Sequence, residues 1–425
     1  MLSSGAAPRR FLACLLAALL GCGARTDLPA PPIPDAAVEV PRVIPCIEVP
    51  ADGTPVRANL VLRAEIGNAD IVFLIDATAS MRQEIEQIRK RLRDRIAPGI
   101  NEAIPGARLG VATFADFPAG NYGDPATDYP FRLHLRTSSE LEQVQAAVDS
   151  IRLGNGMDEP ESQVEALYQL ATGEGIGAYV PASLGCPGGG RGYACFRDDA
   201  LPVVLLFTDA SFHEGPGGHS RYSPAVLGLT PHSYADAVDA LNGLGAKVIG
   251  FDSGPGSLAG NHLRALARDT GTVDDRGQPL VFDIGPTGTN LENDVVDAVR
   301  TFASTLVQDV DAYARDADPD DGVDVETWVQ ALVPVSADPP EGVEAIDLEN
   351  NVFRGVTVGT LITFEILVSA GVVEPGPEPL VVLADIVFRG DGRNTLDVTR
   401  VELVVPALDG TGCEDPLDAE VLEAR

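Results

Sequence analysis

The chain has 425 residues, of which 45% are hydrophobic, so it is long enough for two or three domains and its composition argues against global disorder. Its 30 basic and 63 acidic residues give a formal net charge of −33. Recognition of phosphate needs a basic surface, so nucleic acid is excluded as the expected partner. The charge suits a surface that attracts cations, although most of these carboxylates are expected simply to be solvated.

The N-terminal residues predict export. Arg9 and Arg10 precede an apolar run at 11–20 that is too short to span a bilayer as a helix. The run ends in Leu-Leu-Gly-Cys at 19–22, which resembles a bacterial lipobox. The resemblance implies a signal peptide at 1–22 that ends at a lipidated Cys22; an ordinary secretory signal with an incidental cysteine is the alternative. Glycine follows at 23, and by resemblance to proteobacterial lipoproteins this implies the outer membrane of a Gram-negative bacterium.

A tether and a set of cysteines follow. Residues 23–45 are rich in proline and alanine, which predicts an extended tether. With Cys22 lipidated, four cysteines remain, namely Cys46, Cys186, Cys195 and Cys413. An even number in an exported protein predicts disulfides, but four cysteines allow three connectivities. Cys186 and Cys195 flank a glycine-rich loop and are expected to pair locally, which leaves Cys46 with Cys413.

Residues 69–312 are predicted to form an α/β domain. Strands buried on both faces of a parallel sheet are indicated by continuous apolar runs at 71–75, 109–114, 203–207 and 248–251. Shorter strands are expected at 131–135 and 280–282. Helical spacing of apolar residues predicts helices at 85–96, 141–151, 164–170, 235–244, 263–267 and 295–310. This alternation predicts a doubly wound, mostly parallel α/β sheet of the Rossmann type.

The C-terminal residues have a different pattern. From 325 to 425, alternating runs separated by turns predict an antiparallel β-sandwich, with strands at 352–358, 361–368, 380–388 and 398–405. Residues 46–68 also predict strands, which are expected to pair with this C-terminal domain. The α/β domain would then be inserted in the sandwich, or the sandwich would simply follow it. A Cys46–Cys413 disulfide would clasp the two ends of the host domain.

Polar residues lie just beyond the apolar runs, at three places. Asp76, Thr78 and Ser80 follow the first strand, Asp209 follows the strand at 203–207, and Glu161 precedes the helix at 164. The carboxyl ends of parallel strands meet at one edge of a sheet, where such folds bind ligands. Carboxylate and hydroxyl oxygens suit Mg²⁺ or Mn²⁺. Alternatively, Thr78 or Ser80 simply caps the next helix, and the carboxylates are ordinary loop residues.

Together these segments resemble the von Willebrand factor type A (VWA) family over roughly residues 69–312, and within it the I-like domain of integrin β subunits. The likeness is carried by Asp-Ala-Thr-Ala-Ser-Met at 76–81, Phe-Ala-Asp-Phe-Pro at 114–118, Asp-Glu-Pro-Glu at 158–161 and Phe-Thr-Asp-Ala at 207–210. The resemblance implies a metal-ion-dependent adhesion site (MIDAS) with Mg²⁺ or Mn²⁺ and one position open to a partner's carboxylate. By position its ligands are Asp76, Thr78, Ser80, Glu161 and Asp209, with Asp76 and Asp209 often acting through water.

The same resemblance implies a second, Ca²⁺ site beside the first. Its ligands would be Asp116, Asp158, Glu161 and the backbone carbonyl of Pro160. Integrin β subunits carry an asparagine two residues before the equivalent of Asp158, where this chain has Gly156. Arg82 and Gln83 come before Glu84, and a third ion is therefore not predicted.

Charge counting links the two sites. Asp76, Glu161 and Asp209 bring three negative charges against the two positive charges of one metal ion, so the main site would keep a net charge of −1 and repel a carboxylate ligand. A second cation that shares Glu161 would relieve this repulsion. The hypothesis is that acidic ligands bind weakly with Mg²⁺ alone and more strongly when Ca²⁺ is added.

Other features have ordinary interpretations. His213 and His219 are expected to be loop residues and not zinc ligands, because no spacing of cysteine and histidine supports a site. The loop at 173–199 either determines partner choice, as the resemblance implies, or is a disulfide-stabilised insertion. The acidic stretch at 316–324 departs from the pattern of a calcium-binding loop and is interpreted as a linker.

The leading functional hypothesis is a binding or adhesion module on a lipid-anchored cell-envelope protein. Its partner would be a protein, or another acidic ligand, held through the metal, and its contact with the membrane would be through the lipid anchor only. A metal-dependent hydrolase is the rival, but no positioned general base and no nucleophile motif is present, so the chain is predicted not to be an enzyme. A structural envelope-assembly protein, whose ion only stabilises the loops, is the third hypothesis.

Overall fold

We describe the fold from a computed structural model, which covers residues 44–254, 258–289, 291–320, 322–417 and 419–421. The predicted signal peptide, Cys22 and all but the last two residues of the predicted tether at 23–45 lie outside the described residues. Within the described ranges, no helix combines the length and the apolar character needed to cross a membrane.

The α/β domain is built on a six-stranded sheet with the order β5-β4-β3-β6-β7-β8. In chain order the strands are β3 (Ala69–Asp76), β4 (Arg108–Phe114), β5 (Arg132–Ser138), β6 (Leu201–Thr208), β7 (Lys247–Asp252) and β8 (Val281–Asp283). Neighbours pair in parallel except at the edge, where β5 runs antiparallel to β4. Every residue of β3 and β6 is buried, as expected for central strands covered on both faces. The prediction of a doubly wound, mostly parallel sheet is confirmed.

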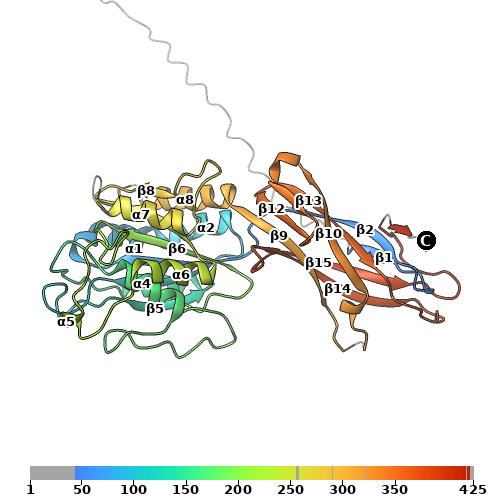
Figure 1. Ribbon diagram of the computed structural model, residues 1–425, viewed down its shortest axis with the longest axis horizontal. Helices are drawn as coiled ribbons and strands as arrows, with labels where there is room; N and C mark the ends of the chain where they lie inside the picture. Colours follow the sequence, from blue (N-terminus) through green and yellow to red (C-terminus); the bar gives the residue numbers. More distant parts are fainter. Residues whose placement is uncertain (1–43, 255–257, 290, 321, 418, 422–425) are drawn as a thin grey trace, which may run out of the picture. The chain divides into compact units, whose positions relative to one another are not determined.

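Helices cover both faces of this sheet (Figure 1). One face packs against α1 (Arg82–Arg91), η2 (Leu92–Ile96), α2 (Ala97–Ala103), α3 (Leu141–Asp149) and α8 (Leu291–Thr305). The other packs against α4 (Gln163–Thr172), α6 (Tyr234–Leu244) and α7 (Leu258–Asp269). Two short elements lie in connections: η1 (Ala79–Met81) follows the end of β3, and α5 (Pro224–Leu227) lies in the long connection between β6 and α6.

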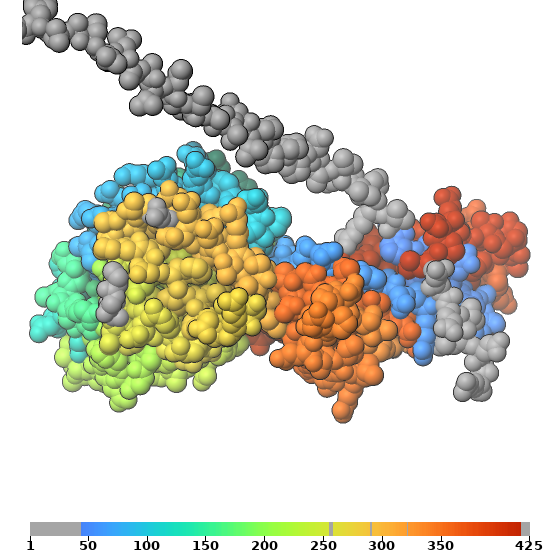
Figure 2. Space-filling model, turned by 90° about the horizontal axis from the view of Figure 1, so that it is seen from above, coloured from blue at the N-terminus to red at the C-terminus, as the bar shows by residue number. Residues whose placement is uncertain are grey.

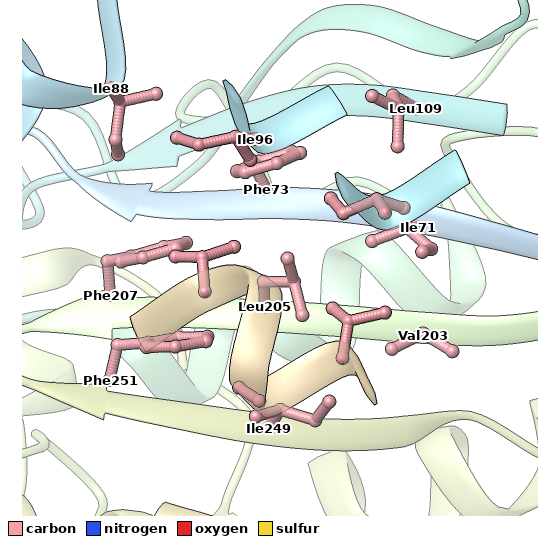
Figure 3. Packing of buried hydrophobic residues seen from close by; sticks show 14 of the residues in the cluster. Ile71, Phe73, Ile88, Ile96, Leu109, Val203, Leu205, Phe207, Ile249 and Phe251 are labelled. Carbon is pink, nitrogen blue, oxygen red and sulfur yellow. The ribbon is translucent and has the colours of Figure 1, made fainter. Parts of the chain in front are cut away.

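Side chains from neighbouring strands form a continuous apolar layer on the first face. Figure 3 shows Phe73, Phe207 and Phe251 side by side on three adjacent strands, with Ile88 and Ile96 among the side chains of the same cluster. The rings of Phe207 and Phe251 are stacked with centroids 4.5 Å apart. This packing holds the carboxyl ends of β3 and β6 rigidly beside each other, because buried side chains interlock at high density.

The second domain is a sandwich of two sheets. The six-stranded sheet has the order β1-β15-β14-β9-β12-β11 and the four-stranded sheet the order β10-β13-β2-β16. The bounds of these strands are β1 (Cys46–Glu48), β2 (Val56–Arg63), β9 (Val307–Asp316), β10 (Val329–Asp338), β11 (Ala345–Asp347), β12 (Val352–Thr357), β13 (Leu361–Val368), β14 (Leu380–Gly390), β15 (Asn394–Val405) and β16 (Ala419–Val421). Two single turns, η3 (Val325–Thr327) and η4 (Pro340–Gly342), join them. Apolar residues of both sheets share one core.

Both ends of the described chain contribute to the sandwich. Strand β2 lies between β13 and β16, and β1 pairs with β15 in parallel, in contrast to the antiparallel pairing of the other sandwich strands. Figure 2 shows the blue N-terminal strands next to the red C-terminal ones. A disulfide joins Cys46 to Cys413, with Cα atoms 5.9 Å apart, and a second joins Cys186 to Cys195. Along the chain, the α/β domain therefore stands between two strands of the sandwich.

One predicted boundary was wrong. The helix predicted at 295–310 ends at Thr305, and residues Val307–Asp316 form β9, which pairs with β14 and β12 near the middle of the six-stranded sheet. The α/β domain, which was predicted to end at 312, therefore ends at about residue 306. The C-terminal part of the sandwich, which was predicted to begin at 325, begins there. Leu306 and Val310 continue the helical spacing of the preceding turns, but Val310 also fits a strand in which 308 and 310 are buried, and pairing with two neighbours decides between the two. Strands β10, β11 and β16 and the short helix α5 were not predicted, and the helix predicted at 85–96 continues through α2 to Ala103.

Candidate metal centre

The first segment of the predicted site lies where β3 ends. Asp76 is the last residue of β3 and is fully buried. Its Oδ1 accepts hydrogen bonds from the backbone N–H of Thr78 at 2.9 Å and from the Thr78 hydroxyl at 2.7 Å. The Thr78 Oγ1 is 3.1 Å from the Oγ of Ser80. Thr78 precedes η1 but makes no side-chain cap to it, so its hydroxyl faces Asp76 and the capping alternative is not what the structure contains.

Side chains at the end of β6 connect to this first segment by hydrogen bonds. The Ser80 hydroxyl donates to Oδ1 of Asp209 at 3.0 Å, and the Thr208 hydroxyl donates to Oδ2 of Asp76 at 2.8 Å. Gln163, the first residue of α4, donates from Nε2 to the Thr208 Oγ1 at 2.9 Å. The carboxyl ends of β3 and β6 are thus joined by side-chain hydrogen bonds at the edge where such sheets bind ligands.

Glu161 is brought to the same place by backbone pairing. Its N–H donates to the Ser211 carbonyl, and its own carbonyl accepts from the His213 N–H, each at 2.9 Å. Its carboxylate lies beside Gly156, because a Cβ placed on that glycine would come within 2.5 Å of Oε1 and 3.4 Å of a Thr78 methyl carbon. Glu161 is 4% exposed and its Oε2 is buried without a hydrogen-bond partner. A buried carboxylate oxygen with no donor is the feature that a bound cation would satisfy.

The electrostatics of the site favour a bound cation. Burial raises the pKa of Asp76 to about 7, with a further contribution from Asp209. Burial and four neighbouring carboxylates, led by Asp76 and Asp116, raise the pKa of Glu161 to about 12. Burial also raises the pKa of Asp209. In the described part of the chain, no lysine or arginine forms a salt bridge with these three carboxylates, so a divalent cation is the natural counter-charge.

The spacing of the carboxylates limits how one ion would be held. Among the described residues, Asp76, Glu161 and Asp209 do not form a group whose ligand atoms all lie within 4.8 Å of one another. All three therefore cannot bind one ion directly in this arrangement. The hydroxyls of Thr78 and Ser80 lie between them, which fits an ion bound by hydroxyls and carboxylate with other carboxylates acting through water.

A second acidic cluster is present, but its side chains differ from those of the predicted second site. One ligand atom each from Asp116, Asp158 and His213 lie within 4.8 Å of one another. His213 Nε2 is 3.2 Å from Asp158 Oδ2 and 3.4 Å from Asp116 Oδ2. Asp116 follows β4 and is fully buried, and His213, which is 3% exposed, stands four residues after Asp209. His213 thus lies in a loop, as predicted, and faces two carboxylates; whether it is a metal ligand stays a prediction.

The other predicted members of the second site have different positions. Pro160 is half-buried between Glu159, which accepts hydrogen bonds from Ser211, and Glu161. Asn155 stands one residue before the position that is asparagine in integrin β subunits, but its side-chain amide donates to Asp124 Oδ2 at 2.6 Å. The acidic group of the second site is therefore joined by an imidazole from another loop and not by the amide of Asn155.

Several residues around the site were not singled out from the sequence. Asp128 accepts from four donors and fixes the loop at 154–156. Tyr222 donates from its phenol to Asp116 Oδ1, and its ring stacks on His213 with centroids 4.0 Å apart. Glu84 in the first turn of α1 is buried, and burial, with a contribution from Asp209, raises its pKa to about 7. Tyrosine and aspartate in glycine-rich loops carry no pattern that would have identified these roles.

Comparison with known proteins gives similar structures but no sequence relatives. No family model and no curated protein matches the chain. A von Willebrand factor type A protein from Catenulispora acidiphila has 15% identity and a TM-score of 0.35 over 85% of this chain and 72% of its own. The pilus adhesin SpaC from Lactobacillus rhamnosus GG, in its open conformation, has 10% identity and a TM-score of 0.33 over 84% and 46%. Proximal thread matrix protein 1 from the mussel byssus has 14% identity and a TM-score of 0.32 over 58% and 48%.

These scores are low, and the fold assignment rests on the sheet itself: its strand order, its antiparallel edge strand and the polar loops gathered at one edge. The α/β domain has a doubly wound, mostly parallel sheet with one antiparallel edge strand. The fold class that the predicted resemblance to VWA domains implied is thereby confirmed, whereas the closer likeness to integrin β subunits stays a prediction. The chain spans about half the length of the pilus adhesin and of the mussel protein, so nothing about their activities is carried over.

Proposed function

We propose that the chain is a metal-dependent binding module, in which Asp76, Thr78, Ser80, Glu161 and Asp209 hold Mg²⁺ or Mn²⁺ at the carboxyl edge of the VWA sheet. The observation that carries this proposal is the hydrogen-bonded series from Asp76 through Thr78 and Ser80 to Asp209, next to the unpartnered carboxylate oxygen of Glu161. Such hard oxygen ligands suit a small divalent cation.

Several side chains at this edge would contribute to ligand recognition, each in a different way. Asp76 and Thr208 fix the orientation of the first loop, and Gln163 fixes Thr208 in turn. Ser80 is exposed and Asp209 half-buried, so the solvent side of the site is open to a ligand. A bound Mg²⁺ supplies positive charge that attracts a carboxylate from a partner. The expected ligand is therefore an aspartate or glutamate side chain of another protein.

The setting of the module is part of the proposal. A lipobox at Cys22 and a proline-rich tether would display it on the outer membrane. Neither His213 nor any other described histidine lies at the Asp76–Asp209 edge within hydrogen-bond reach, which favours a binding role over hydrolysis.

A peptide-display selection tests the proposal. The library is selected in Mg²⁺, and each recovered peptide is tested again in EDTA and with its acidic residue changed to the amide. Binding that needs both the metal and the carboxylate is the expected result, and Asp209→Asn should abolish it whereas Asp239→Asn, an exposed control on α6, should not. Capture that persists in EDTA would support the structural role instead, and turnover of phosphoester or peptide substrates lost in Asp209→Asn would support the hydrolase.

The charge hypothesis is tested on the same peptides. With Mg²⁺ alone the main site keeps its excess negative charge, so affinity for an acidic peptide should be weak, and it should rise when a second cation occupies the neighbouring cluster. Titrating a selected peptide with Mg²⁺ alone and then with Ca²⁺ or Zn²⁺ added measures this. Equal affinity in every metal condition would show that the two sites are not coupled.

A further inference from the structure

The cluster of Asp116, Asp158 and His213 carries an inference of its own, which stands whether or not the main site binds Mg²⁺. We propose that these three side chains form a zinc site that discriminates against Ca²⁺. The acidic residues alone would favour a hard cation held by oxygen atoms. The added imidazole nitrogen shifts the preference toward zinc and similar transition metals.

The orientation of His213 supports a ligand role. Its Nδ1 lies at hydrogen-bond distance from the Ser220 carbonyl, which can only accept, so Nδ1 carries the proton and donates. The lone pair of the neutral ring is then on Nε2, which faces the two carboxylates. A lone pair pointing at carboxylate oxygens is repulsive unless a proton or a metal ion lies between them. Metal-binding histidines typically have their other ring nitrogen bound to a backbone carbonyl in this way.

Asp116 is also positioned to bind a metal ion. Its Oδ1 accepts from the Phe117 N–H at 2.6 Å and from the Tyr222 phenol, whereas its Oδ2 is buried with no hydrogen-bond partner and points into the cluster. Asp116 is fully buried, so this oxygen has no access to bulk water. The unpartnered oxygen is the second, independent observation that points to a bound cation.

The distances and the access route fit an ion. Two ligands bound at about 2.0–2.1 Å to a tetrahedral ion lie about 3.3 Å from each other. The separations of Nε2 from the two carboxylate oxygens, 3.2 and 3.4 Å, are of this size. The Asp158 side chain is 35% exposed, which gives an ion a path from solvent and leaves room for water as a further ligand.

The imidazole is held rigidly by aromatic neighbours. The ring of Tyr222 stacks on it, and the ring of Tyr122 meets it edge-on with centroids 5.2 Å apart. Tyr122 also accepts a hydrogen bond from the Ser223 N–H, next to Tyr222. Fixed side chains of this kind lose little freedom when an ion binds, which favours a tight site.

Zinc titration in saturating Mg²⁺ tests the proposal. Because Mg²⁺ then occupies the main site, the binding of Zn²⁺ measures the affinity of the cluster. The protein is first freed of metal and then saturated with Mg²⁺, Zn²⁺ is added by calorimetric titration, and Co²⁺ is used as a visible-absorbing substitute. The wild type should bind one Zn²⁺ that excess Ca²⁺ does not displace, and Co²⁺ should show ligand-field absorption. His213→Ala should lose at least about tenfold in affinity, the smallest loss that removal of even an outer-shell partner usually causes.

Two further variants keep the result unambiguous. Asp158→Asn changes a partly exposed side chain, so it should fold even if His213→Ala does not, and it should weaken Zn²⁺ binding in the same way. His219→Ala removes a histidine of the same loop whose ring meets His262 edge-on outside the cluster, and it should leave binding unchanged. Zinc binding as tight in Asp158→Asn and His213→Ala as in the wild type, or displacement of Zn²⁺ by equimolar Ca²⁺, would overturn the zinc site. Absence of Mg²⁺ binding would overturn only the proposed function.

Discussion

The hydroxyl of Ser80 donates a hydrogen bond to the carboxylate of Asp209 across 3.0 Å, although the two residues are 129 positions apart in the chain. The contact exists because β3 and β6 are adjacent parallel strands, so that the loops leaving their carboxyl ends meet. A cation bound at this place would be coordinated by the oxygen of the Ser80 hydroxyl, which keeps its proton.

Ser80→Ala is expected to lower the affinity for Mg²⁺ by at least about tenfold, the lower end of what loss of a supporting ligand costs. Ser80 is exposed, so the substitution should leave the fold intact, and its effect can be read as lost coordination. Calorimetric titration of the metal-free protein measures the change. Ser304→Ala, on α8, is the matched control because its hydroxyl donates only within its own helix. An unchanged affinity in Ser80→Ala would remove Ser80 from the ligand set.

The buried pair of Asp70 and Arg197 is expected to be important for the stability of the α/β domain. Asp70 in β3 is fully buried and accepts from the Arg197 N–H at 2.6 Å and from its side-chain Nε at 2.9 Å. Removing the arginine leaves an uncompensated buried charge, so Arg197→Ala should lower the free energy of unfolding by about 3–5 kcal/mol. Chemical unfolding followed by far-UV circular dichroism measures this loss.

An exposed ion pair provides the comparison for Arg197. Arg300 on α8 and Glu102 on α2 are 2.6 Å apart, with side chains 49% and 71% exposed. Because solvent screens such a pair, Arg300→Ala should change the free energy of unfolding by no more than about 1 kcal/mol. Similar losses in Arg197→Ala and Arg300→Ala would contradict the view that burial of Asp70 makes the difference.

The contact of His232 with Glu165 predicts a pH-dependent contribution to stability. Burial by itself lowers the pKa of His232, but the hydrogen bond and the charge of buried Glu165 outweigh burial and raise the pKa above 6.5. A histidine with a raised pKa contributes stability that is complete below pH 6.5 and is lost as the pH rises through the folded-state pKa. The melting temperatures of wild type and His232→Gln should therefore differ most at about pH 6 and least at about pH 9, because the histidine loses its proton between these two values.

The Glu165→Gln variant checks the origin of this dependence. With the carboxylate gone, the pKa of His232 should no longer be raised, and the pH dependence of the His232→Gln substitution should disappear in the Glu165→Gln background. A pH dependence that persists in that background would assign it to another group.

The disulfide between Cys46 and Cys413 is expected to stabilise the sandwich. It joins positions 367 residues apart, so its loss frees a long stretch of the unfolded chain, and the double variant Cys46→Ser/Cys413→Ser should lose about 2–5 kcal/mol. The single tryptophan, Trp328, is part of the sandwich core and reports its unfolding by fluorescence. Cys186→Ser/Cys195→Ser, which opens a link between positions only 9 residues apart in the other domain, should leave the tryptophan transition nearly unchanged.

The meeting of the proposed main-site residues at one edge of the sheet was largely predictable from the sequence because their pattern is local. Asp76, Thr78 and Ser80 lie within five positions of one another, directly after an apolar run that could only be a buried strand. Asp209 has the same relation to its own strand. Parallel strands with buried faces then require these ends to meet at one edge, and the structure places them there.

The second cluster was not predictable in the same way. His213 belongs to a glycine-rich loop without periodicity, and its approach to Asp158 follows from the backbone pairing of Glu161 with residues 211 and 213. Asn155 is next to the expected ligand position, yet its amide turns to Asp124. Side-chain direction in loops is set by such contacts and not by sequence spacing.

By itself, the sequence determined the alternation of strands and helices, the cysteines available for pairing and the motif at the end of β3, because each depends on residues close together in the chain. Tertiary structure alone decided that the segment after Thr305 is a strand of the sandwich and that His213 faces Asp116 and Asp158. Both outcomes depend on which distant backbone offers hydrogen bonds to a segment whose own pattern permits more than one conformation.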